Sequence, residues 1–326
     1  MHTPLFEAIK KDNPNHEITV WLAPRGTQIL AENNPNIDHV LSPKLKRPFL
    51  INFSTFQKIS QQNFDISIML SPGQQWKGAT YMYLTGAKQR IAHQYPYLAS
   101  HQSSFLLTDS IPEQEGLHDI NQNLNLLEPL DIIRSKVPLY HLDIPSRHKE
   151  KGNQLFSNLN LSSTKTIIGI HPGSAPDFTW KRWSINNFAK TARHFIKNHD
   201  AHILIFGGPK EMKIKKSLRK EIGKKSCSII DANLLDTSAV MQNCHAFISN
   251  DSGLMHLAAA SGVKTYGLFG PTDENITGPR GADSHVIRAQ ETSPVYHTEK
   301  NYQLGGATHS TLLALTPKDV IQQIKL

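Results

Sequence analysis

Short apolar runs alternate with amphipathic segments along the second half of this chain. Runs typical of buried strands cover residues 166–171, 202–206, 227–230, 246–249 and 265–269. The segments around 186–198, 237–242 and 253–260 have the spacing of helices that lie against a sheet. Strands and helices that alternate in this way predict a parallel sheet with helices on both faces, which binds ligands at the carboxyl ends of its strands.

The first half of the chain shows the same alternation less clearly. Residues 3–11 begin with the pair Thr-Pro, which suits the first turn of a helix. Residues 17–22 and 64–70 are typical of strands, and residues 121–130 are typical of an amphipathic helix. We therefore expect a second α/β unit in this half.

The chain is long enough for two domains. A length of 326 residues suits two α/β domains of roughly 150 residues each better than one compact core. The polar stretch 138–152 (PLYHLDIPSRHKEKG) contains two prolines and is typical of a linker. We predict a Rossmann-like domain in residues 1–145 and a second in residues 153–326.

A last helix is predicted at residues 316–326 (TPKDVIQQIKL). Thr316 suits its N-cap position and the following proline suits its first turn. Val320, Ile321 and Ile324 form an apolar stripe that must be buried. We expect this stripe to pack toward the first domain.

Composition restricts the classes of function. Thirty-five Lys and Arg against 27 Asp and Glu give a net charge of +8, which suits phosphorylated ligands, anionic lipid or nucleic acid. The basic residues are scattered and no RNA-binding motif accompanies them, so nucleic acid is not an expected partner. Two cysteines without a C-x-x-C pair predict neither a disulfide framework nor a metal site. No secretion signal or membrane-spanning run is visible, so we expect a cytoplasmic protein.

The segment 171–183 (HPGSAPDFTWKRW) leaves a predicted strand and enters a predicted helix. Gly173 lets the backbone approach a bulky anion, Ser174 offers a hydroxyl and an N–H, and Lys181 brings positive charge. A diphosphate suits such a loop. The alternative is an ordinary solvated loop with a basic capping run.

Two further loops also follow predicted strands. In residues 206–211 (FGGPKE), the carboxylate of Glu211 could accept hydrogen bonds from a ribose diol, unless it is simply a solvated side chain in a turn. In residues 247–260 (FISNDSGLMHLAAA), Ser252 and Gly253 expose N–H groups where a helix begins, which favours a phosphate.

Two side chains in the segment 247–260 could serve chemistry or packing. Phosphate would repel the carboxylate of Asp251, which is better placed to bind a sugar hydroxyl or a cationic acceptor group. His256 lies one turn into the predicted helix, where a histidine is more often a packed structural residue than a catalyst.

Taken together, HPGSAPDFTWKRW, FGGPKE, NDSGLMHLAAA and LFGPTDENITGPRG resemble, in order and spacing, the motifs of glycosyltransferase family 9, the ADP-heptose:lipopolysaccharide heptosyltransferases. The resemblance implies the α/β GT-B architecture, in which two Rossmann-like domains face a central cleft and bind acceptor and ADP-heptose respectively. It assigns the diphosphate to Ser174 and Lys181 and the ribose to Glu211. It assigns the sugar and phosphates to Asp251, Ser252 and Gly253, and it leaves His256 in the donor site without a defined role.

The resemblance is incomplete at the amino end. Family members begin with a strand and a Gly-Asp loop, which carries their catalytic aspartate, before a helix whose start resembles Thr3-Pro4-Leu5. We therefore expect the first strand of the amino-terminal domain to be missing from this chain. The catalytic base is then unknown, with Asp251 as the fallback candidate, and we expect a chain that begins at Met1 to bind the donor without transferring heptose.

The leading hypothesis is inverting transfer of heptose from ADP-heptose to a lipopolysaccharide core acceptor. We expect a monomer, in peripheral contact with the anionic inner membrane, that needs no metal or other cofactor, because the basic loop and helix starts could neutralise the leaving ADP. The alternatives are an inactive nucleotide-sugar-binding paralogue or truncated product, and transfer to a protein acceptor. An oxidoreductase is disfavoured because no G-x-G-x-x-G follows a predicted strand.

Overall fold

The chain divides into two compact units. The computed structural model describes residues 1–22, 26–43, 53–71, 75–95, 104–134, 138–295 and 309–326. Unit 1 comprises Met1–Pro138, and unit 2 comprises Leu139–Leu326. The predicted linker at 138–152 is wrong in its second part, because helix α6 (Ser146–Ser157) begins there and packs within unit 2.

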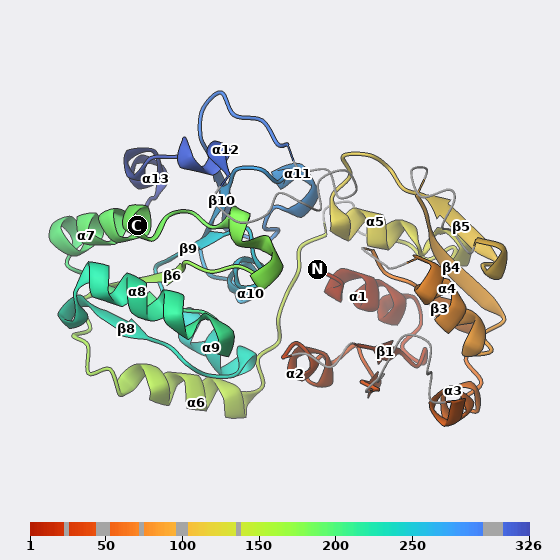
Figure 1. Ribbon diagram of the computed structural model, residues 1–326. Helices are drawn as coiled ribbons and strands as arrows, with labels where there is room; N and C mark the ends of the chain where they lie inside the picture. The colour runs from red at the N-terminus through yellow and green to blue at the C-terminus, as the bar shows by residue number, and fades with distance from the viewer. Residues whose placement is uncertain (23–25, 44–52, 72–74, 96–103, 135–137, 296–308) are drawn as a thin grey trace. The chain divides into compact units, whose positions relative to one another are not determined.

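Unit 2 is built on one parallel sheet (Figure 1). Its strands are β6 (Thr166–His171), β7 (Ala201–Ile205), β8 (Cys227–Ile229), β9 (Ala246–Asn250), β10 (Thr265–Phe269) and β11 (Ser284–Arg288). They lie in the order β11-β10-β9-β6-β7-β8, so the direction of progression reverses between β6 and β9. Doubly wound sheets bind ligands at such a reversal.

Helices join or follow these strands. They are α7 (Ile185–His199), α8 (Met212–Ile222), α9 (Leu234–Met241), α10 (Gly253–Ala260), α11 (Glu274–Thr277), α12 (Ser310–Leu313) and α13 (Pro317–Gln323). Short 3-10 turns are η4 (Pro176–Lys181), η5 (Pro209–Glu211) and η6 (Lys224–Ser226). The doubly wound α/β fold predicted from the sequence is confirmed for this unit.

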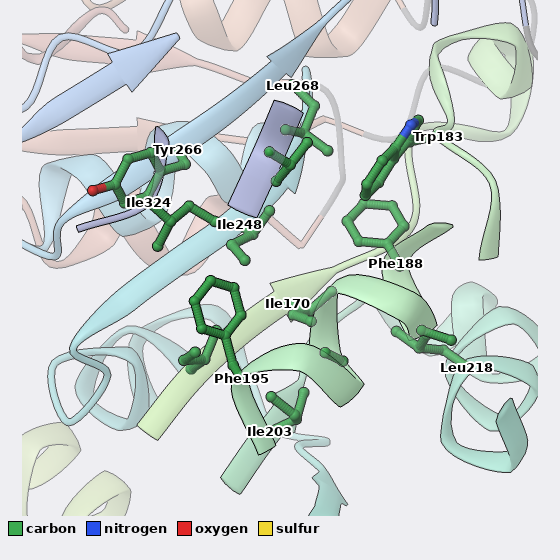
Figure 2. Close-up of a cluster of buried hydrophobic side chains, with 14 of the residues drawn as sticks. Ile170, Trp183, Phe188, Phe195, Ile203, Leu218, Ile248, Tyr266, Leu268 and Ile324 are labelled. Atoms are coloured by element: carbon green, nitrogen blue, oxygen red, sulfur yellow. The ribbon is translucent and has the colours of Figure 1, made fainter. Parts of the chain in front are cut away.

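Alternate residues of the strands bury one face of the sheet (Figure 2). Ile170 and Ile248 lie on neighbouring strands and point to the same side, where Phe188 and Phe195 of α7 cover them. Leu218 of α8 completes this cluster. Every second side chain of a β-strand points to the same face of the sheet. The observed register of strand pairing therefore brings these apolar side chains together in one core.

Glycines let helices pack closely, both against the sheet of unit 2 and against each other. A Cβ added to Gly267 in β10 would lie 2.6 Å from the sulfur of Met255 in α10. A Cβ added to Gly152 in α6 would lie 2.4 Å from the Cβ of Ala239 in α9. The two glycines therefore set the spacing of α10 from the sheet and of α6 from α9.

The buried carboxylate of Asp236 in α9 accepts hydrogen bonds from two side chains of α6. Asp236, 1% exposed, accepts from His148 Nδ1 at 2.5 Å and from Lys151 Nζ at 2.9 Å. Burial alone would raise the pKa of Asp236, but the hydrogen bonds from His148 and Lys151 outweigh it and hold that pKa below its ordinary value. The carboxylate therefore stays ionised between the helices at neutral pH.

The carboxyl-terminal helix α13 is present, with Thr316 as its N-cap. Its apolar stripe is buried as predicted, since Val320 and Ile324 belong to the hydrophobic core of unit 2. The expectation that this stripe packs toward the first domain is wrong, because α13 lies against α7. The indole of Trp183, buried beside α7, also donates to the carbonyl of Leu315 just before the helix.

Unit 1 carries shorter elements around two parallel sheets. Its helices are α1 (Thr3–Asp12), α2 (Gln28–Glu32), α3 (Phe53–Ser60), α4 (Gln75–Leu84) and α5 (Asp119–Asn125), with 3-10 turns η2 (Ser104–Leu106) and η3 (Glu128–Leu130). Strands β1 (Thr19–Trp21) and β2 (His39–Leu41) form one sheet. Strands β3 (Ile66–Ile68), β4 (Gln89–Gln94) and β5 (Asp109–Pro112) form the other.

Aromatic packing joins strand β1 to helices α3 and α4 within unit 1. The ring of Trp21 in β1 stacks on Tyr81 of α4, with centroids 5.4 Å apart, and contacts Phe56 of α3. A doubly wound domain has one continuous sheet, whereas the described strands of this unit form two. Among the described residues, no helix combines the length and the apolar character needed to cross a bilayer.

The Asp236 carboxylate leads to a stability prediction. We expect Asp236→Ala to lower the free energy of unfolding by about 3–5 kcal/mol at pH 7, because the two hydrogen bonds from His148 and Lys151 to a buried carboxylate are lost, each worth about 1.5–3 kcal/mol. Since the folded pKa lies below the unfolded one, this contribution is present above about pH 4 and is lost as the pH falls through the folded value. Urea unfolding at pH 7 and pH 3 measures both effects.

Asp283 provides the matched control. It pairs with His285 at 2.7 Å, and its side chain is 45% exposed. Asp283→Ala should cost less than about 1 kcal/mol at pH 7. Equal costs for the two substitutions would contradict the structural role given to Asp236.

Candidate functional site

The loops that follow β6, β7 and β9 meet at the reversal of the sheet. Parallel pairing of β6 with β9 sets His171 opposite Ser249. His171 is buried, and its Nδ1 lies 2.9 Å from Ser252 Oγ while its Nε2 lies 3.2 Å from both carboxylate oxygens of Glu211. One histidine at the end of β6 thus joins predicted site residues from the two other loops.

Asn250, at the end of β9, holds the first loop against the third. Its Nδ2 donates to the carbonyls of Pro172 and Gly173 at 2.9 and 3.1 Å. Its Oδ1 accepts from the backbone N–H of Trp183 at 2.9 Å. The fully buried amide therefore fixes both ends of the loop that contains Ser174 and Lys181.

Glu211 presents a fixed carboxylate at the end of η5. Its Oε2 accepts from the backbone N–H of Gly208 at 2.7 Å, in addition to its contacts with His171. Burial alone would raise the pKa of Glu211, but His171, the Gly208 N–H and the charge of Arg182 outweigh it and lower that pKa. The side chain remains 17% exposed, and a contact between this ionised carboxylate and a ribose stays a prediction.

Lys181 and Asp251 form an ion pair. Lys181 Nζ lies 2.7 Å from Asp251 Oδ2, and the side chains are only 16% and 6% exposed. The ammonium also lies 5.3 Å and 5.5 Å from the ring centroids of Phe178 and Trp180. The predicted cation and the predicted carboxylate of the site are therefore partners of each other.

Ser174 is turned inward. Its hydroxyl donates to the carbonyl of Phe178 at 2.7 Å and accepts from Arg182 Nε at 3.0 Å. Arg182 Nη2 also donates to the carbonyl of Ser174 at 2.9 Å. These bonds shape the loop, and a contact between Ser174 and a diphosphate stays a prediction.

The start of α10 supplies backbone donors. Gly253 is exposed, and a Cβ added there would meet no atom within 4 Å among the described residues. The Ser252 hydroxyl makes no capping bond to α10 in the described chain, because it faces His171 and Ser249. The first N–H groups of the helix therefore carry the partial positive charge that favours an anion.

His256 lies one turn further along α10. Tyr140 Oη lies 2.8 Å from His256 Nδ1 and accepts from the backbone N–H of Arg280 at 2.6 Å. Burial raises the pKa of the Tyr140 hydroxyl, so it stays protonated beside His256. The ring of His256 is thereby held in one orientation, while its contact with a donor stays a prediction.

Sequence reasoning missed three residues of this arrangement. His171 and Asn250 are polar residues at the buried ends of apolar strands, and this position was a usable signal. Tyr140 lies in the stretch predicted as a linker, where nothing local indicates its partner His256. Among the described residues, no group of three or more His, Cys, Asp or Glu side chains has the geometry of a metal site.

Comparison with known proteins places this arrangement in a family. The sequence model of glycosyltransferase family 9 (heptosyltransferase) matches residues 52–305. The chain belongs to glycosyltransferase family 9. The resemblance inferred from the four motifs is thus confirmed.

Individual relatives of this family 9 chain are heptosyltransferases. Lipooligosaccharide heptosyltransferase 2 of Campylobacter jejuni is 33% identical over 181 residues, which cover 51% of this chain and 52% of that protein. The chain thus spans about half the length of the first curated relatives that it matches. Lipooligosaccharide heptosyltransferase 2 of Haemophilus influenzae is 23% identical over 347 residues, which cover 99% of this chain and 94% of that protein.

A solved structure supports the fold of this family 9 chain. The structure of E. coli ADP-heptose lps heptosyltransferase II has a TM-score of 0.75 at 21% identity and covers 98% of this chain and 92% of that chain. At this identity the likeness shows the fold alone. It confirms the α/β, GT-B fold class predicted from the sequence.

The crowding around Glu211 gives a prediction for Gly173. A Cβ added to Gly173 would lie 1.8 Å from Glu211 Oε1 and 2.9 Å from His171 Nε2. Gly173→Ala must therefore displace the carboxylate from its bonds, and we expect a loss of about 1–3 kcal/mol in the free energy of unfolding. Urea unfolding of the single variants and of the double variant with Glu211→Ala measures the coupling.

The double variant shows whether the added methyl clashes with the Glu211 carboxylate. In Glu211→Ala the carboxylate is gone while His171 Nε2 stays 2.9 Å from the added methyl, so Gly173→Ala should cost clearly less than it does beside Glu211. An equal cost in both backgrounds would show that the methyl clashes with something other than the carboxylate.

Proposed function

We propose that this family 9 glycosyltransferase transfers heptose from ADP-heptose to a lipopolysaccharide core acceptor, with inversion at the anomeric carbon. The observation that carries the proposal is the meeting of Glu211, the start of α10 and the Lys181–Asp251 pair at the reversal of the unit 2 sheet. The names of the relatives support the donor and acceptor classes, since they are heptosyltransferases of lipooligosaccharide or lipopolysaccharide.

Each group of the site suits one part of this donor. The Glu211 carboxylate can accept two hydrogen bonds from the vicinal hydroxyls of the ribose. The exposed N–H groups at Gly253 and the ammonium of Lys181 can bind the diphosphate. Asp251 is then free to bind a heptose hydroxyl when Lys181 turns toward the phosphates.

The reaction needs charge stabilisation and a base. The bond from C1 of the heptose to the β-phosphate oxygen breaks, its electron pair stays on ADP, and C1 bonds to the acceptor oxygen on the opposite face. Lys181 and the α10 dipole stabilise the charge that develops on the leaving ADP. The acceptor proton must pass to a carboxylate, for which Asp251 is the candidate that these residues offer.

A coupled assay of ADP release tests the proposal. With ADP-heptose and a heptose-deficient lipopolysaccharide acceptor, Asp251 acting as the base gives ADP release that depends on the acceptor, in contrast to the expectation from the sequence alone that this chain binds the donor without transferring heptose. Asp251→Asn should lower this turnover by about 10²-fold or more if Asp251 is the base. Donor binding without any acceptor-dependent release would favour the alternative of a binding protein without catalysis.

The proposed function implies a location for the enzyme. A lipid-linked acceptor implies peripheral contact of a cytoplasmic enzyme with the inner membrane, and the net charge of +8 suits an anionic surface. These two features and the monomeric state stay predictions.

The Lys181–Asp251 pair gives a binding prediction. Lys181→Ala should weaken ADP binding by roughly 1.5–3 kcal/mol, because it removes a charge-assisted bond and leaves Asp251 unpaired beside the diphosphate. The double variant Lys181→Ala/Asp251→Asn should recover part of the affinity, since the repelling charge is gone. Calorimetric titration with ADP measures both values. Unchanged affinity in Lys181→Ala would remove Lys181 from the donor site.

A further inference from the structure

We propose that His171 is a positioning residue that aligns the ribose-binding carboxylate with the phosphate-binding helix start. The inference rests on the proposed donor site and adds a residue to which neither the motifs nor the proposed reaction assigns a role. His171 is 2% exposed and can have little direct contact with a ligand. Both of its ring nitrogens instead reach side chains of the proposed site, Glu211 through Nε2 and Ser252 through Nδ1.

One assignment of the hydrogens satisfies the contacts of this network. Ser249 Oγ donates to the carbonyl of Asn250 at 2.8 Å, so its own proton is used there. Ser252 Oγ then donates to His171 Nδ1. With Nδ1 as acceptor, the ring donates from Nε2 to Glu211.

The first effect of His171 is on the start of α10, where it holds the hydroxyl of Ser252. Hydroxyl or amide side chains cap other helices of unit 2: Ser184 caps α7, Asn233 caps α9 and Thr316 caps α13. Ser252 occupies the same N-cap position in α10 but directs its hydroxyl to His171. His171 thereby keeps a competing oxygen away from the N–H groups that the diphosphate would use.

The second effect of His171 is to fix the position of the Glu211 carboxylate. His171 and the Gly208 N–H hold the carboxylate in place before a ligand arrives. A carboxylate can accept about four hydrogen bonds, so the two donors leave capacity for two ribose hydroxyls. A side chain that is already ordered loses less conformational entropy on binding, which favours affinity.

Two substitutions separate the two effects. The side-chain amide of Asn lies near the position of the imidazole Nδ1, so His171→Asn can keep the contact with Ser252 and loses the contact with Glu211. The longer His171→Gln places its amide near Nε2, so it can keep the bond to Glu211. If His171 positions Glu211, Gln should therefore rescue recognition of the ribose, and Asn should not.

The test compares ADP with 2′-deoxy-ADP, which lacks one hydroxyl of the diol. Calorimetric titration of the full chain gives the ratio of the two affinities for wild type, His171→Asn and His171→Gln. We expect His171→Asn to weaken ADP binding about tenfold and 2′-deoxy-ADP binding less than about twofold. We expect His171→Gln to keep most of the wild-type preference for ADP.

Two control variants accompany the test. His202→Asn removes another buried imidazole of the sheet, one that contacts Ser228 at the amino end of β7, and it should leave the ratio unchanged. Glu211→Gln keeps His171 but weakens the acceptor, and it should abolish the preference for ADP. Combining it with His171→Asn should then change the ratio no further.

The outcomes distinguish the inference from the function on which it rests. A wild-type chain that binds neither nucleotide at millimolar concentration would contradict the proposed donor site and the role of His171 with it. Wild-type binding of ADP together with an equal loss for both nucleotides in His171→Asn would contradict the positioning role alone. Unchanged binding of both nucleotides in His171→Asn would contradict it as well.

Discussion

Parallel pairing of β6 with β9 is the constraint on which the proposed donor site depends. This pairing places the last residue of β6, His171, opposite Ser249 and brings the loops after both strands to one edge of the sheet. Asn250 then joins the β6 loop to β9 through three hydrogen bonds. A shift of one residue in this register would turn these polar side chains to the other face and leave the loops without their partners.

Charge in the site is balanced within the protein before a ligand binds. Lys181 faces Asp251, and Glu211 is stabilised by His171, a backbone N–H and the charge of Arg182. Buried charges that lack partners would cost several kcal/mol each, so this pairing makes the site compatible with a stable fold. In the proposed donor site, a diphosphate would change this balance because it would compete with Asp251 for Lys181. The same pair can therefore serve the stability of the empty site and the binding of an anion.

Most of unit 2 could be predicted because its buried strands are continuous apolar runs. The bounds of β6, α10 and β10 agree with the sequence prediction. Strand β11 was missed because an edge strand is only half buried and therefore carries polar residues. Helix α8 was missed because its many lysines mask the spacing of Ile214, Leu218 and Ile222.

The loops that form the site could be predicted, but the contacts within them could not. Apolar strand ends followed by glycine and polar residues identify the segments that contain Glu211, Ser252 and Lys181. The partners of these side chains depend on tertiary structure, as the inward turn of Ser174 and the pairing of Lys181 with Asp251 illustrate. The partner of α13 was likewise mistaken, because an apolar stripe predicts burial without identifying the surface that covers it.

Hydrogen exchange with and without ADP tests most directly whether the donor site lies at the carboxyl ends of β6, β7 and β9. Our account predicts that saturating ADP slows exchange of backbone amides in residues 171–183, 207–211 and 251–256 and leaves the amides of β8 and β11 unchanged. Protection of unit 1 alone, or binding of ADP without protection of these three loops, would contradict it.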